Sequence, residues 1–323
     1  MRKVSIALLV FASLMLFTAC TESGDVTGPA SAEYIGGTTG LLIDFLEDSP
    51  PASILDNSQQ TFTITVQLEN GGEVDIPKDK CWVSITGINP EDFYSSIGEL
   101  TDINPDENIE GNKLNPDTGQ TIPSYPVYVE FTDLKYVDSL SGGGHNFPVY
   151  ADVCYEYATE ASAELCIKKD LTDSLDDHVC QVSGPKDFET SGAPVQITTF
   201  EEYPSGKNAI AFTFTVKHMA NGKISQLGTR CSDSVTDENK VKVTVDTDIE
   251  GDLTCSGLTD LDATTGSGYI KLSGGERTVR CTQKLPLEDK RTDHIKIIKL
   301  TLDYDYFDHK ETTLRVQHSE LDE

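Results

Sequence analysis

The feature that most constrains the fold of this chain is an internal repeat with an offset of about 150 residues. Short segments in the first half recur in the second half, in the same order and at nearly the same spacing. Several such matches in colinear order indicate a duplicated building block. The matched segments are FTITV (62–66) with FTFTV (212–216), Asn70-Gly71 with Asn221-Gly222, Cys81 with Cys231, VCYEY (153–157) with LDYDY (302–306), and LCI (165–167) with LRV (314–316).

Each copy has the sequence pattern of β-strands. In residues 62–69 apolar side chains alternate with polar ones up to Asn70-Gly71, which is typical of a half-buried strand followed by a turn. Segments with helical periodicity are missing, and Gly and Pro interrupt the chain about every ten residues. The other predicted strands are 41–46, 82–88, 127–131 and 149–157 in the first copy, and 197–200, 210–216, 241–245, 269–272, 295–306 and 312–316 in the second.

We therefore expect an all-β protein with two tandem immunoglobulin-like β-sandwich domains. The first domain is predicted at residues 35–170 and the second at residues 192–318, with a linker at 171–191 and a short tail at 319–323. The segment FTITVQLENGGEVDI (62–76) and the two closing segments, 151–167 and 300–316, resemble CARDB-type and related immunoglobulin-like modules of prokaryotic, especially archaeal, surface proteins. This resemblance implies structural or binding units rather than enzymes.

The N-terminus predicts export and membrane anchoring. Arg2 and Lys3 precede an apolar run of 14 residues (4–17), which is shorter than the roughly 20 residues of a membrane-spanning helix. Residues 1–19 are therefore predicted to be a signal peptide. Thr18-Ala19-Cys20 resembles a lipobox, with Phe17 where an aliphatic residue is usual, so Cys20 is the predicted lipidation site; plain cleavage or an uncleaved anchor are the alternatives. Residues 20–34 are small and polar and are predicted to form a flexible tether.

The charge of the chain limits its partners. With 54 acidic against 25 basic residues, the formal net charge is −29. Such a protein repels phosphate backbones, so no nucleic-acid partner is expected. An acidic surface suits cations or a basic partner, or it serves only to keep an exposed protein soluble.

Seven cysteines follow Cys20, and in an exported protein they are expected to form disulfides. If the last segment of the first copy is a hairpin with its turn at Glu160, Cys154 and Cys166 face each other and would form a disulfide. The equivalent positions of the second copy, Asp303 and Arg315, would then form an ion pair.

Cys255 and Cys281 are predicted to form a second disulfide. This leaves an odd number of cysteines, so one is free or pairs between chains, and the sequence does not say which. No C-x-x-C motif is present, so zinc is not expected. The three unassigned cysteines are Cys81, Cys180 and Cys231.

Calcium is the only cofactor for which the sequence offers candidate ligands. Carboxylates alternate ahead of Gly251 as in the first half of an EF-hand loop, but Gly257 stands where that loop has its last ligand. A second oxygen-rich run lies in a long loop, 100–125, which is either a loop that binds a partner or a tolerated surface insertion. The alternative for both runs is a solvated turn. The candidate ligands are Asp246, Asp248, Glu250 and Asp252 in the first run, and Asp102, Asn104, Asp106 and Asn108 in the second.

No catalytic motif is recognisable. The six histidines are scattered, and H-E-x-x-H, G-x-S-x-G and phosphate-loop patterns are missing. We expect a non-enzymatic protein on the extracellular face of the cell membrane, held by its N-terminal lipid, that binds a surface protein or a glycan. The alternatives are a self-assembling structural subunit of the envelope, and a calcium- or carbohydrate-binding module that serves an enzyme.

Overall fold

The computed structural model describes residues 33–172, 179–262 and 266–318. The predicted signal peptide, Cys20, most of the tether and the tail lie outside these ranges. Within them the chain is nearly all β, as the sequence predicts, with several antiparallel sheets. The helical elements of this part are a few short turns: η1 (Lys78–Lys80), η2 (Pro90–Phe93), α1 (Ile97–Leu100) and η3 (Glu288–Lys290).

The first small sheet contains β1 (Leu41–Phe45), β3 (Phe62–Asn70) and β7 (Val127–Leu134), in the order β1-β3-β7. We call it sheet A. Its strands form where apolar and polar residues alternate, so that one face of β3 buries its apolar side chains. The second sheet, sheet E, has the order β15-β18-β12-β11-β9. Its strands are β9 (Gly184–Pro185), β11 (Val195–Pro204), β12 (Ala209–His218), β15 (Leu253–Ser256) and β18 (Glu276–Lys284).

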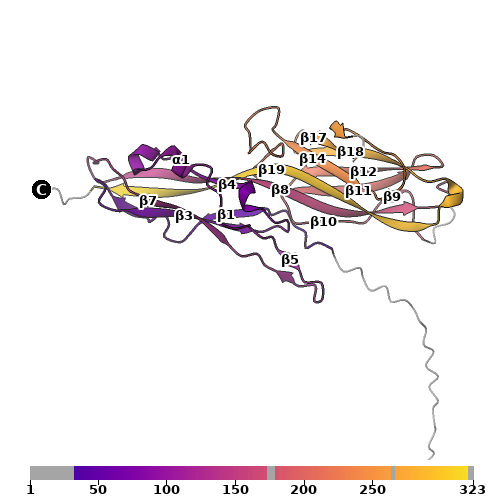
Figure 1. Cartoon of the computed structure of the whole chain (residues 1–323), viewed down its shortest axis with the longest axis horizontal. Coiled ribbons are helices and arrows are strands. Elements are labelled where there is room, and N and C mark those ends of the chain that lie inside the picture. The colour runs from indigo at the N-terminus through magenta and orange to yellow at the C-terminus, as the bar shows by residue number, and fades with distance from the viewer. Residues whose placement is uncertain (1–32, 173–178, 263–265, 319–323) are drawn as a thin grey trace, which may run out of the picture. The chain divides into compact units, whose positions relative to one another are not determined.

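The largest sheet, sheet B, is built on two very long strands, β8 (His145–Ile167) and β19 (His294–Gln317). They pair antiparallel without interruption, from His294↔Ile167 to Val316↔His145. At about 3.3 Å per residue, this ladder is roughly 75 Å long. Figure 1 shows the two strands side by side between the elements of both sequence halves.

Shorter strands extend this ladder at different points. β4 (Cys81–Thr86) pairs with the first part of β8, and β2 (Ser53–Leu55) pairs with the last part of β19. Other strands join where the later part of β8 pairs with the early part of β19. These are β10 (Phe188–Thr190), β14 (Lys240–Asp246), β17 (Ser267–Lys271) and β16 (Thr259–Asp262), with β13 (Lys223–Ser225) pairing nearer the middle of β19.

The hairpin predicted around Glu160 is not present in the structure, so this prediction is wrong. Glu160 lies inside β8 and pairs with Thr301, and Cys154 and Cys166 lie on the same strand instead of facing each other. The predicted ion pair between Asp303 and Arg315 fails for the same reason, because both residues lie on β19. The physical cause is the lack of Gly, Pro, Asn or Asp between Ala158 and Ala163, so nothing favours a turn there.

The predicted division into two domains is not confirmed, because the long ladder joins strands from both halves of the sequence. The described residues from Glu33 onward belong to one compact unit, and their buried apolar side chains form one cluster from Leu41 to Val316. The predicted linker contributes β10 to sheet B, and the end of β19 pairs with β2 near the start of the chain. The last strand of each sequence half, β8 or β19, therefore also pairs with strands of the other half.

Four buried tyrosines mark the middle of the ladder. Tyr155 pairs with Tyr306 and Tyr157 with Tyr304, and their ring centroids are 5.6–6.4 Å apart around a closed square. The hydroxyl groups are hydrogen bonded, as buried polar groups should be. The Tyr155 hydroxyl accepts the N–H of Leu41, and that of Tyr157 lies 3.0 Å from Oδ1 of Asn70.

Three disulfides connect six of the seven described cysteines. Cys255–Cys281 is present as predicted and joins β15 to β18. The other two are Cys154–Cys231 and Cys166–Cys180, so the predicted Cys154–Cys166 disulfide is wrong. Cys81 is a buried free thiol.

The sequence match of Cys81 with Cys231 is not a structural match. Trp82 of β4 pairs with Cys154, and Lys242 of β14 pairs with Asp303, which lies 149 residues after Cys154. By strand pairing, the counterpart of Cys81 is therefore Val241. Cys231 lies in the loop that precedes β14.

Candidate binding surface

The long loop predicted at residues 100–125 contains a projecting hairpin, which we call the hairpin arm (111–126). Its two short strands, β5 (Lys113–Leu114) and β6 (Thr121–Ile122), pair only with each other. Figure 1 shows the arm leaving the sheets. The long loop predicted here therefore contains a short hairpin that the sequence analysis did not predict.

The turn of the arm is set by Asn115. Its side-chain Oδ1 accepts the N–H groups of Asp117 at 3.0 Å and of Thr118 at 3.1 Å. Its main chain pairs with Gln120 and Gly119, and Gly119 has a φ of 66°, which favours glycine. The sequence N-P-D-T-G-Q thus encodes a defined turn, and all side chains from Pro116 to Pro123 are exposed.

The base of the arm is fixed to sheet A by Asn112 and Gly111. The Asn112 Nδ2 donates to the carbonyl of Gly71 at 3.0 Å, and its Oδ1 accepts the N–H of Ser124 at 2.9 Å. At Gly111 a Cβ would lie 2.5 Å from the main chain of Glu73, so only glycine fits. The arm therefore leaves the body from a rigid base.

Exposed apolar side chains gather where the arm enters β7. Ile122 is 47% exposed, Tyr125 is 76% exposed and Tyr128 is 44% exposed. Tyr128 lies on the outer face of sheet A opposite Gln67, beside Glu130. Single exposed apolar residues are ordinary, but these three lie within seven residues of the sequence, and this apolar patch offers area that suits a partner.

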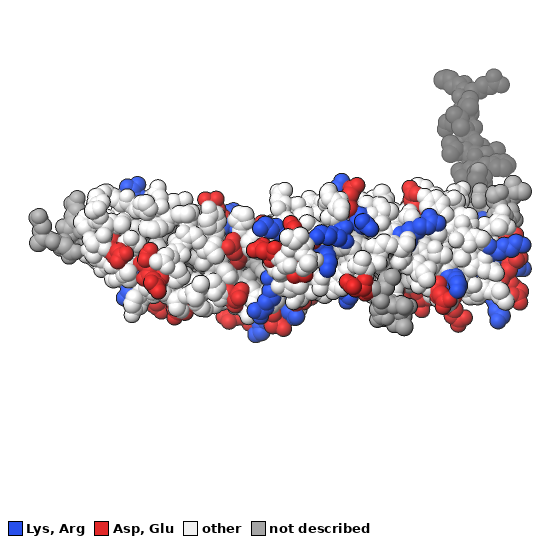
Figure 2. All heavy atoms as spheres, turned by 90° about the horizontal axis from the view of Figure 1, so that it is seen from above, with Lys and Arg blue, Asp and Glu red and all other residues white. Residues whose placement is uncertain are grey.

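This patch lies in a strongly acidic part of the chain. The strands of sheet A contain four acidic residues and no Lys or Arg. Residues 33–167 contain 24 Asp and Glu against four Lys and Arg, whereas residues 184–318 contain 21 against 17. Figure 2 shows one face of the molecule, on which Lys and Arg are scarce towards the left and more frequent from the middle to the right. The hairpin arm and the outer face of sheet A thus combine aromatic and acidic groups, and we call them together the arm surface.

The structure spreads the first set of calcium candidates along an exposed loop. Asp248 forms an ion pair with Lys296 at 2.6 Å, and Asp252 forms one with Lys284 at 2.7 Å. The lysines hold the pKa values of both carboxyls below their usual range, chiefly through the side-chain hydrogen bond. The carboxylates of Asp248 and Asp252 therefore pair with two different lysines and do not converge on one cation site.

A buried glutamine organises the same loop from inside. Gln283 donates to the carbonyl of Lys284 at 2.8 Å and to that of Gly251 at 3.3 Å, and it accepts the Thr247 hydroxyl at 2.8 Å. The amide thus bonds main-chain oxygens that a cation could otherwise bind. Asp246 accepts the N–H of Asp248, and Glu250 lies in the same loop.

The second set of calcium candidates follows the edge of β4 and η1. Asn104 donates to the carbonyl of Cys81 at 2.5 Å, and Asn108 accepts the N–H of Lys78 at 3.0 Å. Asp102 donates its N–H to Ser84, and the Asp106 carbonyl accepts from Lys78. Within the described residues, no group of three or more His, Cys, Asp or Glu side chains converges on one point as a metal site requires.

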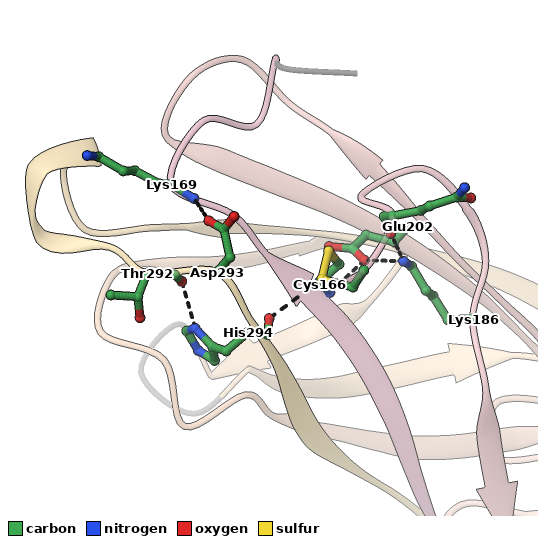
Figure 3. The surroundings of a disulfide bond; sticks show 9 residues. Cys166, Lys169, Lys186, Glu202, Thr292, Asp293 and His294 are labelled. Atoms are coloured by element: carbon green, nitrogen blue, oxygen red, sulfur yellow. Dashed lines mark hydrogen bonds and ion pairs between the residues drawn. A yellow bond between two sulfur atoms is a disulfide. The ribbon is translucent and has the colours of Figure 1, made fainter. Parts of the chain in front are cut away.

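A cluster of charged residues surrounds the Cys166–Cys180 disulfide, and the sequence alone gave no sign of it (Figure 3). The buried Glu202 of β11 accepts the N–H of Cys166 at 2.9 Å and forms an ion pair with Lys186 at 3.1 Å. Burial raises the pKa of Glu202 to about 7, although the Cys166 N–H and Lys186 oppose this shift.

Two further polar contacts hold the segments on either side of this disulfide against the start of β19. The Lys169 N–H donates to Asp293 at 2.6 Å, and the sulfur of Cys180 lies 3.8 Å from the carbonyl oxygen of His294. Because Glu202 is fully buried, its carboxyl group helps to hold these strands together and is not accessible to solvent.

Comparisons with known proteins give no family. No family model and no curated protein match the chain. Among solved structures, the secreted serine protease VesC from Vibrio cholerae aligns with 84% of this chain at 9% identity and a TM-score of 0.18. The aligned part is 51% of that chain, and at this TM-score the likeness carries no argument. In the described residues, no helix is long and apolar enough to cross a membrane.

Proposed function

We propose that this chain is an exported, non-enzymatic binding protein of the cell surface. Three disulfides support export, because disulfides persist in oxidising compartments. The N-terminal sequence supports anchoring through a lipid on Cys20, with residues 20–34 as the tether. The observation that carries the binding role is Tyr125, which is 76% exposed at the base of a rigidly fixed hairpin.

The mechanism follows from the chemistry of the arm surface. Tyr125, Tyr128 and Ile122 offer apolar area that a partner can cover, and aromatic residues are enriched at the centres of protein interfaces. The acidic groups around them favour a partner with basic side chains and speed its approach. We therefore favour a basic surface protein over a glycan as the partner.

A direct test uses the mature chain from residue 21 onward, immobilised on a sensor surface and exposed to solubilised envelope of the source organism. Saturable binding is expected. A variant with Ile122→Ser, Tyr125→Ser and Tyr128→Ser should bind at least tenfold more weakly, whereas Val235→Ser, which removes another exposed apolar side chain, should bind like the original. Equal binding by all three proteins, or the lack of saturable binding, would contradict the proposal.

The anchor needs a separate test. In cells, the full chain should partition into the detergent phase, and Cys20→Ser should move it to the aqueous phase or the medium. A full chain whose Cys20 carries no lipid, as mass spectrometry of its N-terminal peptide would show, would contradict lipidation at this residue.

A further inference from the structure

A cavity of about 360 Å³ lies beside the Cys154–Cys231 disulfide, and none of its lining residues belongs to the arm surface. Strands β8, β13 and β19 contribute Asp152, Lys223 and Phe307 to its lining. The loop between β13 and β14 contributes the other side. The volume is at the lower end of the range for small-molecule sites, so the cavity suits a compact ligand.

The loop that closes this cavity is held firmly in place. Its Cys231 is bonded to Cys154 of β8, and the buried Asp305 accepts the N–H groups of Gly228 at 2.9 Å and of Cys231 at 3.3 Å. Arg230 lies 4.7 Å from the centre of the Trp82 ring. The loop is thus attached to both long strands, and the cavity is largely preformed.

The charges around the cavity are mainly negative. The carboxylates of Asp152, Asp233 and Glu238 line it, against the single ammonium group of Lys223. Lys223 lies 5.5 Å from the centre of the Phe307 ring, which shows that this aromatic face can attract a cation.

Ser225 gives independent evidence for a missing partner. It lines the cavity and is 5% exposed, and its Oγ has no hydrogen-bond partner among the described residues. An unpaired buried hydroxyl costs about 1–3 kcal/mol, so a native structure normally provides a partner for it. A ligand with N–H groups would donate to this oxygen and to the nearby carboxylates.

We propose that this cavity binds a small organic cation, with a primary ammonium or guanidinium group and a short apolar part. The cationic group would donate hydrogen bonds to Ser225 and to Asp233 or Glu238, and the apolar part would lie over Phe307. This site is independent of the arm surface.

The test is a titration of the mature chain with butylammonium and, in parallel, with the neutral 1-pentanol of similar size, followed by calorimetry or NMR. Butylammonium should bind saturably and pentanol should not compete. Asp233→Asn with Glu238→Gln should weaken binding at least tenfold, and Ser225→Ala should weaken it several-fold. Asp289→Asn, which removes an exposed carboxylate outside the cavity lining, should leave binding unchanged.

Near-UV circular dichroism of each variant would confirm that it folds. Three results would overturn the proposal: no saturable binding of butylammonium, equal binding of pentanol, or an equal loss of affinity in Asp289→Asn. Failure here would leave the proposed function intact, because the two experiments use different surfaces and different ligands.

Discussion

Glu156 lies directly opposite Asp305 in the β8–β19 ladder. These two residues are 149 apart, which is the spacing between the matched segments 153–157 and 302–306. The tyrosine pairs Tyr155–Tyr306 and Tyr157–Tyr304 therefore lie symmetrically on either side of them. Because the ladder continues well beyond this centre in both directions, neither sequence half can complete its sheets without the other.

The shared ladder predicts one cooperative unfolding transition. Trp82, the only tryptophan, pairs with the ladder through β4 in the first half of the sequence. Its fluorescence should change at the same urea concentration as the far-UV circular dichroism, which reports on all strands. Two separate transitions would indicate two independent domains.

Two glycines near the central tyrosines should not tolerate a side chain. At Gly222 a Cβ would press on the Tyr306 ring and lie 2.5 Å from the carbonyl of Phe307, and at Gly72 it would press on the Tyr157 hydroxyl. Overpacking of this kind typically costs about 1–3 kcal/mol. Urea unfolding of Gly222→Ala and Gly72→Ala should show losses of this size, whereas Gly143→Ala, with open space around it, should show little change. Equal stability of all three variants would mean that these close contacts are not present.

The buried Glu202 should make stability depend on pH. Its pKa is raised to about 7, chiefly by burial, so between about pH 4.5 and 7 the folded chain keeps a proton that the unfolded chain releases. The free energy of unfolding should therefore fall as pH rises through this interval, by up to about 3 kcal/mol from this group.

Urea unfolding at pH 4.5, 6 and 8 would measure this contribution. Glu202→Gln should lack it, and Glu276→Gln, at an exposed site, should keep it. If the pH profiles of Glu202→Gln and the original chain coincide, Glu202 does not titrate in this range.

Cys81 should be unreactive in the folded protein. Its side chain is fully buried, and burial raises the pKa of the thiol to about 12, so almost no thiolate forms at pH 8. Iodoacetamide should modify Cys81 of the mature chain from residue 21 only after unfolding in guanidinium, as mass spectrometry would show. Rapid modification of the native protein would place this thiol at the surface.

Local patterns in the sequence predicted the strands well, because the alternation of apolar and polar residues fixes which face of a strand is buried. The strand at 62–70 and its Asn-Gly end are in place, and Cys255 pairs with Cys281 as predicted. The same alternation fits both a hairpin and one long strand, so it could not show that β8 passes straight through Glu160. The missing turn residues around Glu160 were the available signal.

The site was harder to predict than the fold. The length of the loop 100–125 indicated a possible binding segment. The exposure of Tyr125 and Tyr128, however, depends on how the arm leaves sheet A. The carboxylates at 246–252 resembled a calcium loop in sequence, yet two of them pair with Lys284 and Lys296, which are 32 and 48 residues further along the chain. Such distant contacts depend on strand pairing, which local sequence does not encode.

Mapping the disulfides of the mature, non-reduced chain by proteolysis and mass spectrometry tests the shared ladder most directly. The structure predicts one linked peptide pair containing Cys154 and Cys231 and another containing Cys166 and Cys180. A peptide pair joining Cys154 to Cys166 would restore the hairpin at Glu160 and contradict the continuous strand on which the whole architecture depends.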